Sequence, residues 1–86
     1  MHVAVRRLLL DAFKPRESSI IELSKAICST EGAEEVDIIV SEVDSKTETI
    51  KVIVTGPRIE YDVVSKVMER YGISIKGVDE ISVTKI

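Results

Sequence analysis

The stretch EVDIIVSEVDSKTETIKVIVTG (residues 35–56) contains two apolar runs with a short polar segment between them. In each run every second residue is aliphatic, and these residues lie on one side: Val36, Ile38, Val40, Ile50, Val52 and Val54. Alternation of this kind predicts β-strands, over 35–44 and 49–55. The four or five polar residues between the runs predict that the two strands form a hairpin.

Upstream of the hairpin, VAVRRLLLDAF (residues 3–13) carries apolar residues on both sides of the chain, which is typical of a central strand. Pro15 ends it. Ser19 then stands three residues before Glu22, which is the spacing of a capping box, and a helix is predicted from there to Gly32. The first half of the chain is therefore predicted to form a strand, a helix and a second strand.

Downstream, Gly56 and Pro57 end the hairpin and a second helix is predicted up to Gly72. The apolar stripe of this helix comprises Val63, Val64, Val67, Met68 and Tyr71. Residues 73–86 predict a last strand in which the alternation slips at Gly77, as it does at a β-bulge. The second half repeats the order of the first.

The order βαββαβ with right-handed crossovers predicts a ferredoxin-like, two-layer α+β sandwich formed by one domain, residues 1–86. Its antiparallel sheet would have the strand order 4-1-3-2, with both helices on one face. The even positions of the first three strands would then form the core. The other face would carry several apolar residues that a lone domain leaves exposed: Val5, Leu9, Phe13, Ile39, Val43 and Ile53.

The composition excludes several classes of protein. The net charge is −3, and Phe13 is the one aromatic residue on the two central strands, so nucleic-acid binding is not expected. Neither a signal peptide nor a membrane span is recognised, and a cytoplasmic protein is expected. The chain has no Asn and no Gln among its 86 residues, a depletion that favours a thermophilic source.

The densest acidic cluster lies in the hairpin, where Glu42, Asp44 and Glu48 fall within seven positions. The first interpretation is that Lys14, Arg16 and the start of the first helix neutralise Glu42 and Asp44. The alternative is a weak Ca²⁺ or Mg²⁺ site made by these two carboxylates, within one subunit or between subunits. No other cofactor is expected.

Thiol, imidazole and nucleophile chemistry is not indicated. Cys28 has no second cysteine, and His2 is the one histidine, so neither a transition-metal site nor a hydrolytic triad is expected. Asp11 is an acid in an apolar strand, and an ion pair with Lys51 on the neighbouring strand accounts for it. A functional carboxylate at Asp11 is the alternative.

Four segments together resemble a family of small archaeal proteins classified as a domain of unknown function with a ferredoxin-like fold: RRLLLDAFKP, SIIELSKAI, EGAEEVDIIVSEVDSKTETIKVIVTG and IEYDVVSKVMERYGISIKGVDEI. The resemblance extends from about Arg6 to Ile81. It implies an archaeal source and assembly into homo-oligomers. It implies no reaction and no catalytic residue.

Two classes of function follow. The first is a cofactor-free homo-oligomeric binding or regulatory module, whose small-molecule ligand lies between subunits. The alternative is an enzyme whose composite active site contains Asp11 and Glu42 of neighbouring subunits. In either case the oligomer is expected to be cyclic, larger than a dimer, and joined through the 78–86 segment, which the bulge at Gly77 would turn away from its own sheet.

Overall fold

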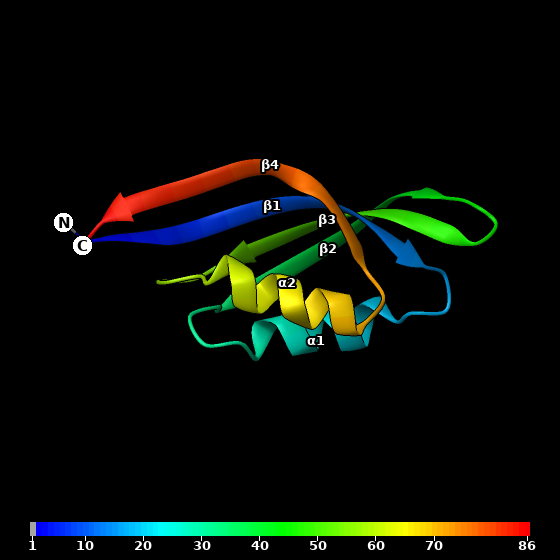
Figure 1. Ribbon diagram of the computed structural model, residues 1–86, viewed down its shortest axis with the longest axis horizontal. Helices are drawn as coiled ribbons and strands as arrows, with labels where there is room; N and C mark the ends of the chain where they lie inside the picture. Colours follow the sequence, from blue (N-terminus) through cyan, green and yellow to red (C-terminus); the bar gives the residue numbers. More distant parts are fainter. Residues whose placement is uncertain (1) are drawn as a thin grey trace.

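A computed structural model describes residues 2–86 of the protein (Figure 1). The elements in chain order are β1 (Val3–Pro15), α1 (Ile20–Cys28), β2 (Glu35–Val43), β3 (Thr47–Thr55), α2 (Tyr61–Arg70) and β4 (Ser74–Lys85). The strands form one antiparallel sheet in the order β2-β3-β1-β4. This is the predicted order 4-1-3-2, so the α+β sandwich of the ferredoxin-like type is confirmed.

Both helices cover the same face of the sheet (Figure 1), and the hydrophobic core lies between them and the even-numbered residues of β1 and β3. The fully buried side chains of these two strands are Leu8, Leu10, Ala12, Ile50, Val52 and Val54. From the helices, Leu23 and Ile27 of α1 and Val64, Val67 and Met68 of α2 complete the core. The predicted core phase is therefore correct for β1 and β3, whereas in β2 Val36 and Ile38 are only partly buried and Val40 is 37% exposed. Within residues 2–86, neither helix is long and apolar enough to cross a membrane.

The helix boundaries have the predicted causes. The hydroxyl of Ser19 accepts hydrogen bonds from the backbone N–H groups of Ile21 and Glu22, which caps α1. Gly32 and Gly72 follow the helices with φ of 93° and 78°, a conformation that L-residues with a side chain seldom adopt. Val63, predicted for the buried stripe of α2, is instead 45% exposed.

β4 stays paired with β1 to its end, from Phe13↔Ser74 to Val3↔Lys85. The prediction that the last segment turns away from its own sheet is therefore wrong. Register shifts leave Lys76 and Asp79 without a partner on β1, on either side of Gly77. Each bulge alters the local twist without separating the two strands, because the hydrogen-bonded ladder resumes after one extra residue.

At one end of the sheet β1 and β4 continue without their neighbours. Pairing of β1 with β3 begins at Arg7, whereas its pairing with β4 begins at Val3. Residues 3–6 and 83–85 therefore form a two-stranded ribbon that projects beyond the helices at one end of the molecule, whose extents are 46 × 22 × 17 Å (Figure 1). The backbone N–H of Ile86 donates to the carbonyl of His2 at the tip.

The sheet face away from the helices is called the open face below. Leu9 and Ile53 are half-buried there, and the exposed fractions of Phe13 and Ile39 are 40% and 53%. Val5 was also predicted for this face, but it packs against the core, because the bulge at Arg6 changes its phase. Val43 was predicted for this face as well. The register shift between Val40 and Glu42 instead places Glu42 opposite Thr49 and Val43 opposite Glu48. Val43 therefore lies on the side of the sheet that the helices cover.

Candidate functional site

Glu42 and Asp44 line the same depression, of about 530 Å³, at the hairpin end of the sheet. Phe13, Val43, Thr47 and Thr49 complete its lining. Asp44 closes the turn, because its backbone N–H donates to the carbonyl of Thr47 and its carboxylate accepts from the N–H of Ser45. The structure thus brings the two predicted metal-ligating residues to one site.

The third acid of the hairpin, Glu48, has a different environment. Lys14 lies opposite Glu48 on the helix side of the sheet, and its ammonium is 2.9 Å from the Glu48 carboxylate. Arg16 approaches the same carboxylate at 4.0 Å. The prediction that Lys14 and Arg16 neutralise Glu42 and Asp44 is therefore wrong, since the pleat places Lys14 and Glu42 on opposite faces.

Lys14 is 2% exposed, and its ammonium group is fully engaged. Besides the ion pair, it donates to the backbone carbonyls of Pro15 at 2.7 Å, Arg16 at 3.4 Å and Ser18 at 2.5 Å. A buried charge requires such partners, because an unpaired one costs several kcal/mol, on the order of 3–5. Lys14 thus fixes the connection between β1 and α1 and is not a free functional amine.

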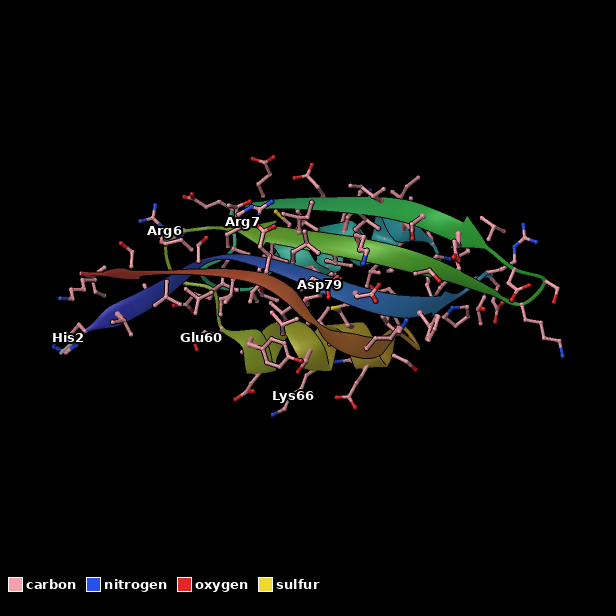
Figure 2. All side chains as sticks on the ribbon, turned by 90° about the horizontal axis from the view of Figure 1, so that it is seen from above. His2, Arg6, Arg7, Glu60, Lys66 and Asp79 are labelled. Atoms are coloured by element: carbon pink, nitrogen blue, oxygen red, sulfur yellow. The ribbon has the colours of Figure 1, made fainter. Side chains whose placement is uncertain are left out.

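Across residues 2–86 no three side chains of His, Cys, Asp or Glu converge in a way that could hold a metal ion. His2 lies at the tip of the ribbon (Figure 2), and Cys28 ends α1 with its thiol 3.5 Å from the carbonyl of Glu34. Hard cations such as Ca²⁺ take six to eight oxygens. Glu42 and Asp44 alone supply fewer, so a cation bound there would also need oxygens from backbone carbonyls, water or a second subunit.

In the middle of the open face, Asp11 forms the predicted ion pair with Lys51, at 3.1 Å. Lys76 approaches its other oxygen at 3.6 Å, and the Lys51 ammonium donates to Asp79 at 2.8 Å. The Lys51 ammonium lowers the pKa of Asp11, and Lys76 adds to this effect. The hydrogen bond to Asp79 and the carboxylate of Asp11 raise the pKa of Lys51. Both groups are thus held in their charged forms.

The charged cluster continues along β4. Arg7 forms an ion pair with Glu80 within the chain. Lys76 lies 4.7 Å from the centre of the Phe13 ring, within the range of a cation–π contact. The pairs of Lys51 with Asp79 and of Arg7 with Glu80 arise because the bulge at Asp79 presents two consecutive acids to the same face.

A second pocket, of about 430 Å³, lies where β3 ends and the ribbon begins. Figure 2 labels Arg6 and Arg7 at this end of the sheet. The pocket is called the Arg–Glu pocket below, and its lining residues are Arg6, Arg7, Glu34, Glu35, Thr55, Gly56 and Ser82. Sequence reasoning did not find it. The only signal was a pair of adjacent bases and a pair of adjacent acids near two strand starts.

The chain is thus a small ferredoxin-like sandwich with a charged open face. The profile of a family described as Uncharacterized ArCR (DUF211) matches residues 6–86, and the chain belongs to this family. An uncharacterized protein of Methanocaldococcus jannaschii is 32% identical over 77 residues, which are 90% of this chain and 79% of that protein. The expected membership of a small archaeal family without an assigned function is confirmed.

Proposed function

We propose that the protein is a homo-oligomeric binding or regulatory module whose subunits meet through the open face and the edge strands β2 and β4. One observation carries the proposal: large aliphatic side chains stay exposed on these surfaces, with exposed fractions of 53% for Ile39, 55% for Ile81 and 52% for Val83. A long apolar edge of this kind is a template for pairing with another chain.

The two edges differ, which bears on the symmetry of the assembly. β2 and β4 lie at opposite borders of the sheet. A contact between two different edges is heterologous, and heterologous contacts form a closed ring when the rotation between subunits permits it. We therefore propose a ring of more than two subunits, in which Glu42 and Asp44, beside the β2 edge, lie near the neighbouring chain and contribute oxygens to a Ca²⁺ or Mg²⁺ site.

The alternative, a composite enzyme active site with Asp11 and Glu42, has less support. A general acid needs a pKa near neutrality. Lys51 and Lys76 instead lower the pKa of Asp11, so its carboxylate is suited to an ion pair. The binding module is the function that the geometry favours.

The test is the mass in solution of the full chain and of two lysine variants. Ile39→Lys places a charge on the open face, whereas Ile21→Lys is a matched control at a residue 63% exposed on α1. Light scattering after size exclusion should show several subunits for the wild type and Ile21→Lys, and a smaller species for Ile39→Lys. A wild-type monomer at micromolar concentration would contradict the proposal. Deleting 79–86 is less informative, since it removes most of a paired strand.

A further inference from the structure

We propose that the Arg–Glu pocket binds a small zwitterion, either an α-amino acid or a short peptide, with its carboxylate at Arg6 and its ammonium group at the glutamates. This inference deepens the proposed function by naming a ligand class, and it rests on the binding half of that function. The pocket lies within one chain, so it does not depend on the number of subunits.

A β-bulge supplies the basic half of the pocket. Val5 pairs with Val83 and Arg7 pairs with Ser82, so that Arg6 is an extra residue on β1. A bulge places two residues opposite one and redirects their side chains, and here both arginines line one pocket. Bulges are over-represented next to active sites, where they re-aim side chains.

Arg6 retains free hydrogen-bonding capacity. Its Nε donates to the carbonyl of Gly56 at 3.2 Å, which fixes the plane of the guanidinium group. No residue from 2 to 86 accepts a hydrogen bond from its two terminal nitrogens. A guanidinium group oriented in this way can bind a carboxylate through two parallel hydrogen bonds.

The acidic half lies two strands away. Arg7 is opposite Thr55 on β3, and Thr55 is opposite Glu35 at the start of β2. Adjacent strands are about 4.8 Å apart, so the backbones of Arg7 and Glu35 are separated by roughly 10 Å. The long side chains of Arg6, next to Arg7, and of Glu35 can approach a small ligand from both ends, while the hydroxyl of Thr55 lies between them.

The charges of the pocket select against simpler ligands. Arg7 is paired with Glu80, whereas in the part of the chain that the structure describes Arg6 forms no ion pair with Glu34 or Glu35, although the three side chains line one pocket. The acids would repel a phosphate or another anion, and the arginines would repel a simple cation. Only a zwitterion has a favourable charge interaction at both ends of the pocket. The volume of about 430 Å³ is in the range of small-molecule sites.

Calorimetric titration of the full chain tests the inference with α-amino acids and glycylglycine as ligands, and with acetate and methylammonium as half-ligands that carry one charge each. At least one zwitterion should bind, about tenfold or more tightly than either half-ligand, since charge-assisted hydrogen bonds are lost with each missing group. No binding by any zwitterion at millimolar concentration, or equal affinity for acetate, would overturn it.

Two variants locate the site. Arg6→Ala and Glu35→Gln should each weaken binding about tenfold, as expected for one lost charge-assisted contact. Arg70→Ala, in the last turn of α2, is the matched control and should bind as the wild type does. Unchanged affinity in Arg6→Ala and Glu35→Gln would place the ligand elsewhere and refute the inference. If a variant does not fold, the half-ligand comparison on the wild type still decides.

Light scattering on the titrated samples separates the inference from the proposed assembly. If no zwitterion binds to a multi-subunit protein, the inference fails and the assembly stands. If a zwitterion binds to a monomer, the assembly fails and the pocket stands.

Discussion

The two faces of the sheet use the same strands for different purposes. On the helix side, β1 contributes Leu8 and Leu10 to a fully buried core, and even its one charge, Lys14, is buried and satisfied. On the open face, the same strand contributes Arg7 and Asp11 to ion pairs that remain partly exposed. Because successive side chains of a strand point to opposite faces, stability and surface chemistry can be separated within a single strand.

The largest expected effect is a core truncation on β1, compared with its neighbour on the other face. Leu10→Ala removes a side chain that is 0% exposed and should lower the free energy of unfolding by about 3–5 kcal/mol. Leu9→Ala, at a half-buried residue, should cost less than half as much. Urea unfolding at one protein concentration measures both. Equal losses would mean that the open face is as deeply buried in solution as the core is.

A smaller effect is expected when one charge is removed from each face. Lys14→Met removes the ion pair between Lys14 and Glu48 and frees three carbonyl oxygens, and it should cost about 3 kcal/mol. Lys51→Met removes a partly exposed ammonium from the open face and should cost much less, because solvent screens such pairs. Thermal unfolding of the two variants gives the comparison. A more severe loss in Lys51→Met would show that the open-face cluster, and not Lys14, holds the sheet together.

The smallest effect concerns the pH dependence of the open face. The pKa of Asp11 is lowered from 3.8, so its charge stabilises the fold above that pH, and this contribution is lost as the pH falls below it. The pKa of Lys51 is raised from 10.5, so its contribution is present below pH 10.5 and lost as the pH rises beyond. Asp11→Asn should therefore flatten the acid limb of the stability curve.

Melting temperatures of the wild type and Asp11→Asn at a series of pH values measure this effect. Asp37→Asn is a control on β2, since none of the ion pairs within residues 2–86 involves Asp37. It should leave the acid limb as steep as in the wild type. Identical acid limbs for wild type and Asp11→Asn would show that the ion pair does not contribute.

Much of the fold was predictable because it follows from local pattern. Period-two alternation located β2 and β3, Ser19 located the start of α1, and the order of elements predicted the strand order. The candidate site was only partly predictable. Glu42 and Asp44 do line one pocket, and Asp11 does pair with Lys51. The partner of Lys14 was predicted wrongly. The bulge at Ser41 and the pleat of β1 decide which face of the sheet each charged side chain occupies, and neither follows from the local pattern.

By itself, the sequence determined which residues are apolar, at what period they recur and where the chain turns, and these properties specify the sheet, the helices and the core. The Arg–Glu pocket depended on tertiary structure, since Arg6 and Glu35 are far apart in the chain and meet only through the strand order. The continuous pairing of β4 with β1 also depended on tertiary structure. Bulges at Arg6, Lys76 and Asp79 shift the register by single residues, and only the pairing of two distant strands reveals such shifts.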